Sequence, residues 1–182
     1  VSTIVPLRDD ISFIASAAIS CGTGTACGAL ERLDLKASQT IAIFGMGPVG
    51  LSAVMLAHSM GAKIIALDTN KQRLDRSIEF GADIIINPEE STDLLTEIKD
   101  HTKGLGVNAS IDASSSPSAR SSAVKCVKTW GKACFVGEGG EVTLDVSNDL
   151  LRRQVTLIGS WTFSKYGQAE CADFVAEKNL DV

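Results

Sequence analysis

The stretch from residue 41 to residue 68 constrains the fold of this chain more than any other part of the sequence. It reads IAIFGMGPVGLSAVMLAHSMGAKIIALD. An apolar run at residues 41–44 suits a buried strand, and residues 45–50 follow at once with the spacing G-x-G-x-x-G. Residues 48–60 are expected to form a helix, and a second apolar run at 63–67 predicts a second strand. The stretch therefore predicts a strand, a glycine turn, a helix and a second strand that ends in Asp68.

The residue types in this unit suit the binding of a pyrophosphate and its ribose. Gly45 allows a tight turn, Gly47 lets an anion approach the backbone because it has no Cβ, and Gly50 lets the helix pack close to the strand. Pro48 fits the first helical turn, where its missing N–H has no partner, and the free N–H groups beside it attract an anion. Asp68 stands where a carboxylate can accept both hydroxyls of an adenosine ribose. The alternative is a glycine turn that only packs a helix on a strand.

The acid at the end of the second strand also bears on the choice of cofactor. A 2′-phosphate on the ribose would meet Asp68 as a like charge. No arginine follows directly, since the next residues are Thr69, Asn70 and Lys71. The sequence therefore favours NAD over NADP. Lys71 and Arg73 keep NADP open as the alternative, because a nearby cation can accommodate a 2′-phosphate.

Strand and helix signals alternate through the rest of the chain. This alternation predicts an α/β fold, a doubly wound six-stranded parallel sheet (Rossmann) with helices on both faces and right-handed crossovers. The ligand is expected beyond the carboxyl ends of the strands, at the switch point beside the first strand. A further edge strand is expected at 142–146, where apolar and polar residues alternate. The later strands are expected at residues 83–87, 107–113, 132–136 and 154–159, and the later helices at residues 70–80, 92–101, 118–128 and 166–178.

The first 35 residues are expected to form a helical connector outside the sheet. Apolar residues have helical spacing at 9–20 and again at 25–33, and the run CGTGT at 21–25 is expected to break the helix. The predicted division is thus a helical connector at 1–35 and an NAD-binding Rossmann domain at 36–182. The sequence does not begin with Met, so we expect a fragment of a longer protein.

Composition narrows the classes of partner. The chain has 182 residues, of which 45% are apolar and 21% are charged, as is ordinary for one globular α/β domain. A net charge of −5 argues against nucleic acid as the main partner. No run approaches roughly 18 apolar residues, so no membrane span is expected. The five cysteines form no C-x-x-C pair, which suits a reducing, cytoplasmic environment without disulfides.

An ordered series of short segments carries a resemblance to a known family. CGTGTACGA, IAIFGMGPVG, LD at the end of the second strand and EFGAD follow one another from about Asp9 onward. Together they resemble the coenzyme domain of the zinc-containing medium-chain alcohol dehydrogenases. The resemblance implies an oxidoreductase that binds NAD and zinc and moves hydride between a small alcohol or polyol and the nicotinamide. It also implies a homo-oligomer, either a dimer or a tetramer.

The resemblance further implies roles for single residues. Cys21 matches the cysteine that the coenzyme side supplies as a ligand of the catalytic zinc. Asp68 matches the ribose-binding acid, and Arg73 matches the basic residue near it. Residues 142–146 fall near the edge through which family members pair into dimers. The other implied cofactor contacts are Thr25 on the nicotinamide, Gly45, Gly47, Pro48 and Val49 under the pyrophosphate, with Val49 also touching the nicotinamide, and Ala113, Gly137 and Trp161 around the nicotinamide pocket.

Cys21 alone cannot hold a zinc ion, because a catalytic zinc takes three protein ligands beside its substrate position. In the family the other ligands come from an N-terminal catalytic domain, which we expect to be missing here. The chain by itself is therefore expected to be inactive, and no catalytic residue is assigned. From the residues alone, Cys21 could equally be a small buried apolar residue. The remaining cysteines, Cys27, Cys126, Cys134 and Cys171, are predicted to lie in the core.

Three other functions stay open at this point. A zinc-free reductase of the quinone or enone type would bind the same cofactor, although such enzymes lack the cysteine at the position of Cys21. A methyltransferase that binds S-adenosylmethionine also uses a glycine turn and an acid, but it needs no pyrophosphate site. A non-enzymatic NAD-binding module is the third.

The end of the fourth strand carries further polar residues whose role the sequence leaves open. Asp112 is either an acid/base group or, as we expect, a turn and cap residue. Ser114, Ser115 and Ser116 could cap the turn, contact the nicotinamide or do both.

Overall fold

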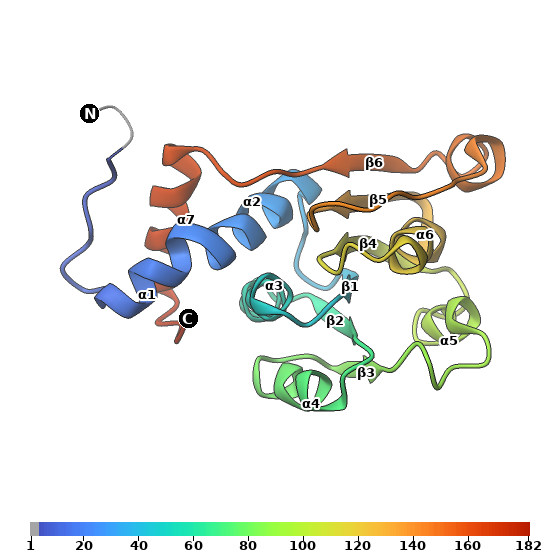
Figure 1. Ribbon diagram of the computed structural model, residues 1–182, viewed down its shortest axis with the longest axis horizontal. Helices are drawn as coiled ribbons and strands as arrows, with labels where there is room; N and C mark the ends of the chain where they lie inside the picture. Colours follow the sequence, from blue (N-terminus) through green and yellow to red (C-terminus); the bar gives the residue numbers. More distant parts are fainter. Residues whose placement is uncertain (1–3) are drawn as a thin grey trace.

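A six-stranded parallel sheet forms the centre of the structure, a computed structural model that describes residues 4–182 (Figure 1). The strand order is β3-β2-β1-β4-β5-β6, and every neighbouring pair is parallel. The predicted doubly wound sheet is thereby confirmed. The strands are β1 (Thr40–Phe44), β2 (Lys63–Leu67), β3 (Ile84–Ile86), β4 (Val107–Asp112), β5 (Val127–Phe135) and β6 (Thr156–Gly159).

Helices connect consecutive strands and lie on both faces of the sheet (Figure 1). The helix predicted at 118–128 ends at Cys126, because Val127 already pairs with Val107 of β4. The helices are α1 (Phe13–Ala18), α2 (Gly24–Leu33), α3 (Pro48–Ser59), α4 (Lys71–Glu79), α5 (Leu94–Asp100), α6 (Pro117–Cys126) and α7 (Lys165–Glu177), with the π-helical segments η1 (Ile19–Thr23) and η2 (Val146–Leu151).

Each face of the sheet has its own apolar cluster. One cluster joins the sheet to α2, α3, α4 and α7, and the other joins it to α5 and α6. Strand β1 serves both clusters, because Ile41 and Ile43 point to the first and Ala42 and Phe44 to the second. All four are at most 1% exposed. Burial on both faces is the environment of a central strand in a parallel sheet.

The strand order reverses beside β1, which pairs with β2 on one side and with β4 on the other. The chain leaves β1 towards α3 on one face and leaves β4 towards α6 on the opposite face. Helix α3 starts very close to β1, since a Cβ on Gly50 would lie 1.8 Å from the carbonyl oxygen of Gly45. Crevices that bind ligands open at such switch points.

The predicted helix break at residues 21–25 is wrong. Segments α1, η1 and α2 form one continuous helical run, and η1 adds a π-helical turn at the place of the expected break. Gly24 keeps right-handed helical angles, with φ −61° and ψ −40°. A Cβ on Gly24 would lie 2.7 Å from the ring of Phe163, and one on Gly22 would lie 3.7 Å from Cβ of Pro48. Gly24 therefore allows close packing of the helix, Gly22 is in ordinary contact with α3, and neither glycine ends the helical run.

The helical run Phe13–Leu33 is long and apolar enough, by length and composition alone, to cross a membrane. Core helices of soluble proteins can share both properties. One third of its apolar window is buried, and α2 packs against α3, α7 and β5. This packing accounts for part of its apolar surface and joins the run to the sheet. The division between a connector at 1–35 and a domain at 36–182 stays a prediction.

The predicted edge strand at 142–146 is also wrong. Residues 142–145 have no regular structure, and η2 begins at Val146. The side chain of Asp145 accepts hydrogen bonds from the backbone N of Ser147 at 3.0 Å and of Asn148 at 3.1 Å. A carboxylate in this position caps the start of a helical segment, so the chain turns into η2 and does not extend along the sheet.

Replacing Gly50 by alanine tests the close approach of α3 to β1. Forcing extra atoms into a packed site costs about 1–3 kcal/mol and at times more. We expect Gly50→Ala to lower the free energy of unfolding in urea by about 2 kcal/mol or more. Gly167→Ala, in α7, is the control, because its new Cβ would lie 3.6 Å from the nearest atom. An equal loss of stability in both variants would contradict the packing argument.

Candidate functional site

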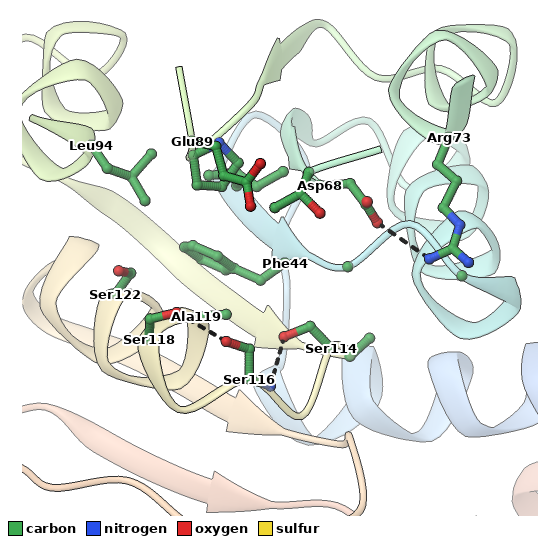
Figure 2. Close-up of a pocket in the computed structure, with 16 residues that line it drawn as sticks. Phe44, Asp68, Arg73, Glu89, Leu94, Ser114, Ser116, Ser118, Ala119 and Ser122 are labelled. Carbon is green, nitrogen blue, oxygen red and sulfur yellow. Dashed lines mark hydrogen bonds and ion pairs between the residues drawn. The ribbon is translucent and has the colours of Figure 1, made fainter. Parts of the chain in front are cut away.

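A cavity of about 640 Å³ opens at the carboxyl ends of β1, β2 and β4 (Figure 2). Phe44 and Gly45 line it at the end of β1, Leu67 and Asp68 at the end of β2, and Ala113 just after β4. The cavity therefore lies at the switch point where the sequence predicts a ligand. Its other lining residues are Gly47, Thr69, Arg73, Pro88, Glu89, Leu94, Ser114, Ser116, Ser118, Ala119 and Ser122.

The glycine turn leaves bare backbone facing this cavity. Gly45 has a φ of +92°, and a Cβ there would lie 2.9 Å from N of Ser114, so this position demands glycine. Gly47 differs, because no atom lies within 4 Å of where its Cβ would be. Gly47 caps α3, and Pro48 occupies the first turn. The missing side chain of Gly47 thus leaves room for a group from outside the protein beside the free N–H groups of a helix start.

Asp68 is held beside the turn by backbone amides. Its Oδ2 accepts a hydrogen bond from N of Met46 at 2.6 Å, and its Oδ1 accepts one from N of Asn70 at 2.8 Å. Nη1 of Arg73 lies 3.9 Å from Oδ2 of Asp68, and the Arg73 side chain is 58% exposed. A contact of this length to an exposed guanidinium contributes little to stability, so the two backbone amides fix the buried carboxylate. Each oxygen can still accept further hydrogen bonds from hydroxyl groups in the cavity.

The cavity brings together part of the predicted cofactor site. Gly45, Gly47, Asp68, Arg73 and Ala113 line it. The other predicted positions lie outside its lining: Thr25 is half-buried in α2, Pro48, Val49 and Gly50 follow the turn into α3, Gly137 follows β5, and Trp161 follows β6 with 67% of its surface exposed.

Sequence reasoning left the role of Ser116 open and missed Ser118 and Ser122 of α6. Ser116 precedes α6, and Ser118 and Ser122 lie on one face of it, four residues apart, across the cavity from Asp68 (Figure 2). Oγ of Ser116 and Oγ of Ser118 are 2.9 Å apart. The run SSSPSARSS carried a signal, because serines at that spacing place hydroxyls along one side of a helix. Asp112, by contrast, is fully buried and does not line the cavity.

The thiols differ in their surroundings. Cys21 is exposed on η1, so the alternative of a small buried residue is wrong for it. Cys126, Cys134 and Cys171 are buried as predicted, while Cys27 is only half-buried. Among residues 4–182, no group of three His, Cys, Asp or Glu side chains is placed to hold a metal ion.

Burial also makes two of these thiols resist ionisation. Removal from water raises the pKa of Cys126 to about 12 and the pKa of Cys134 to about 11. The thiolate is the reactive form, so both thiols are expected to be inert near neutral pH. Cys21 is exposed and remains accessible to reagents.

Brief alkylation of the folded chain at pH 8 tests this difference. Roughly one in a thousand or fewer of the Cys126 and Cys134 thiols is ionised at that pH, and both are buried. Peptide mass spectrometry should therefore find rapid labelling at Cys21 and none at these two positions. Cys21→Ser should lose the rapid label. Equal labelling of Cys126, Cys134 and Cys21 in the folded chain would contradict the structure.

Comparison with known proteins identifies relatives over most of the chain. The model of the zinc-binding dehydrogenase family matches residues 48–177. An uncharacterized zinc-type alcohol dehydrogenase-like protein of Escherichia coli (strain K12), YphC, is 34% identical over 97% of this chain and 50% of its own length. An alcohol dehydrogenase of Geobacillus stearothermophilus is 31% identical over 96% of this chain and 51% of its own length.

A solved structure agrees with these relatives. The 2R,3R-butanediol dehydrogenase of Bacillus subtilis superposes with a TM-score of 0.82 at 26% identity, over 94% of this chain and 48% of that one. The chain thus spans about half the length of the relatives it matches. The family model covers the helix after the glycine turn and most of the sheet. The chain belongs to the zinc-binding dehydrogenase family.

Proposed function

We propose that the chain is the NAD-binding part of a zinc-dependent alcohol or polyol dehydrogenase. The observation that carries this proposal is the open backbone at Gly47 beside the amide-held carboxylate of Asp68. Membership of the family supports the reaction class. Relatives named alcohol dehydrogenase, sorbitol dehydrogenase and butanediol dehydrogenase support an alcohol or polyol as substrate.

In this proposal the chain's residues hold the cofactor by its adenosine half. The helix start at Gly47 faces the pyrophosphate, and the free lone pairs of Asp68 accept the ribose hydroxyls. Ala113, Thr25, Val49, Gly137 and Trp161 are proposed to surround the nicotinamide. Bound NAD would supply the acceptor for a hydride from the alcohol. A solved relative in complex with NADH, at 20% identity, has the same fold.

Cys21 is proposed as one ligand of the catalytic zinc. Its exposure on η1 supports this role, because a ligand thiol must be accessible to a metal and to further ligands. The remaining ligands would come from outside the described residues. A zinc at this place would supply Lewis-acid polarisation of the alcohol oxygen. The zinc-free reductase and the S-adenosylmethionine methyltransferase are less well supported, since the family model is that of zinc-binding dehydrogenases.

We also propose that the full protein forms homo-oligomers, dimers or tetramers, in the cytoplasm. Strand β6 lies at the edge of the sheet, and its Leu157 is 40% exposed. An uncovered edge strand offers free backbone groups to a second copy. Five unpaired thiols suit a reducing compartment.

Replacing Gly47 by alanine should separate binding from folding. The new Cβ would enter open space in the cavity, where we place the pyrophosphate. We expect NAD to bind at least about tenfold more weakly in calorimetric titration, a loss of roughly 1.4 kcal/mol. The free energy of unfolding should change by less than about 1 kcal/mol, the cost of a poorer helix cap. Gly167→Ala is the control for binding, and unchanged NAD affinity in Gly47→Ala would count against the proposal.

Replacing Asp68 by asparagine should change the choice of cofactor. The substitution removes a charge-assisted hydrogen bond to the ribose, worth about 1.5–3 kcal/mol, so NAD should bind roughly ten- to hundredfold more weakly. Loss of the negative charge also removes repulsion towards a 2′-phosphate, so the NADP-to-NAD affinity ratio should rise. Asp75→Asn is the matched control, because Asp75 lies exposed on α4 with Lys71 as its partner at 3.4 Å. The same NAD affinity in wild type and Asp68→Asn would refute the assigned role.

A further inference from the structure

A buried ion pair lies beside the cavity without lining it. Asp112, at the end of β4, is fully buried, and the side chain of Arg120 in α6 is 9% exposed. Nε of Arg120 lies 3.2 Å from Oδ2 of Asp112. Replacing a buried pair of this kind by apolar residues is often neutral or stabilising. Stability alone is therefore a weak reason for its presence.

The pair connects two loops that follow neighbouring strands. Oδ1 of Asp112 accepts hydrogen bonds from N of Ser114 at 3.0 Å and from Oγ of Ser114 at 2.6 Å, in the loop after β4. Nη2 of Arg120 donates to the carbonyl oxygen of Gly137 at 2.6 Å, in the loop after β5. The guanidinium also lies 5.6 Å from the ring centroid of Phe135. A single arginine thus bridges the ends of β4 and β5.

Both loops border the proposed path of the dinucleotide. Ser114 lines the cavity and lies against the glycine turn, because a Cβ on Gly45 would be 2.9 Å from its N (Figure 2). Ser115 packs against the other loop, since a Cβ on Gly137 would lie 2.6 Å from N of Ser115. A shift of the loop after β5 would therefore be transmitted to the loop after β4 and to the glycine turn.

We propose that Arg120 and Asp112 are positioning residues that hold the loops after β4 and β5 in the geometry that NAD binding requires. This inference rests on the proposed NAD-binding function. Arginine suits the role because its planar fork donates to the carboxylate and to the Gly137 carbonyl at the same time. Lysine keeps the charge but has a single donor atom, so it cannot reproduce the bridge.

Arg120→Lys in the full chain tests the proposal. In hydrogen exchange without ligand, the amides of residues 113–116 and 136–140 should exchange about tenfold faster or more, while those of β1 and β2 stay protected. In calorimetric titration well below the unfolding temperature, NADH should bind about tenfold more weakly. Faster exchange in the loops without weaker NADH binding would overturn the proposal, and so would unchanged exchange.

Arg153→Lys is the matched control for a purely structural role. Arg153 donates to the carbonyl oxygens of Val124 and Val127, at the opposite end of α6 from the cavity. Its substitution should lower the unfolding temperature and leave NADH affinity unchanged. If Arg120→Lys also lowers only the unfolding temperature, the ion pair is structural and the proposal is wrong.

A double variant keeps the proposal testable if Arg120→Lys does not fold. The double variant Asp112→Asn with Arg120→Gln leaves no unpaired buried charge. The glutamine side chain at position 120 is shorter than arginine and cannot reach the carbonyl oxygen of Gly137. The double variant should show the same faster exchange and weaker NADH binding. A wild-type chain that binds no NADH would overturn the proposed function. A wild-type chain that binds NADH with the same affinity as both variants would overturn this inference alone.

Discussion

The close approach of Gly50 to the carbonyl of Gly45 is the constraint on which the site depends. Because a Cβ at Gly50 would lie 1.8 Å from that oxygen, α3 can begin directly after β1 only with glycine there. The helix start then faces the cavity through Gly47, which has no neighbouring atom in place of its side chain. The same turn brings N of Met46 to 2.6 Å from Asp68. One backbone contact thus places the open helix start, the bare backbone and the carboxylate together.

Two aspartates at the ends of the strands beside β1 show how their surroundings separate their roles. Asp68 follows β2 and Asp112 ends β4. Each accepts a hydrogen bond from the backbone N–H of the residue two positions later, Asn70 at 2.8 Å and Ser114 at 3.0 Å. Asp112 is fully buried and its charge is balanced by Arg120, so its carboxylate oxygens bond to groups inside the protein. The charged partner of Asp68 is an exposed guanidinium at 3.9 Å, and beyond its two amide hydrogen bonds Asp68 keeps free lone pairs towards the cavity. Burial and pairing, more than residue type, therefore determine which acid can meet a ligand.

The sheet could be predicted because its signals are local: the apolar runs and the glycine turn depend on sequence neighbours. Gly24 could not be interpreted in this way, since a glycine that breaks a helix and one that allows close packing look alike. A Cβ on Gly24 would meet the carbonyl oxygen of Ile19 in the same helical run and also the ring of Phe163, which lies far along the chain. Residues 142–146 alternate like a strand, yet the Asp145 carboxylate caps η2. The spacing of Ser118 and Ser122 places both on one side of a helix, but which cavity they line and which residue pairs with Asp112 depend on how α6 lies over the sheet. No local pattern reveals that arrangement.

The continuity of the N-terminal helical run determines the position of Cys21, the proposed zinc ligand. A flexible break would have left Cys21 free to move relative to the glycine turn. In the structure Cys21 lies on η1 within an unbroken helical run, and the next residue, Gly22, lies against Pro48 at the start of α3. Thr23 adds a link, with its Oγ1 3.1 Å from Oγ of Ser52 in α3. The helix that faces the proposed pyrophosphate site therefore also fixes where the Cys21 thiol lies, and a zinc ion at the proposed site would keep a constant position relative to the glycine turn.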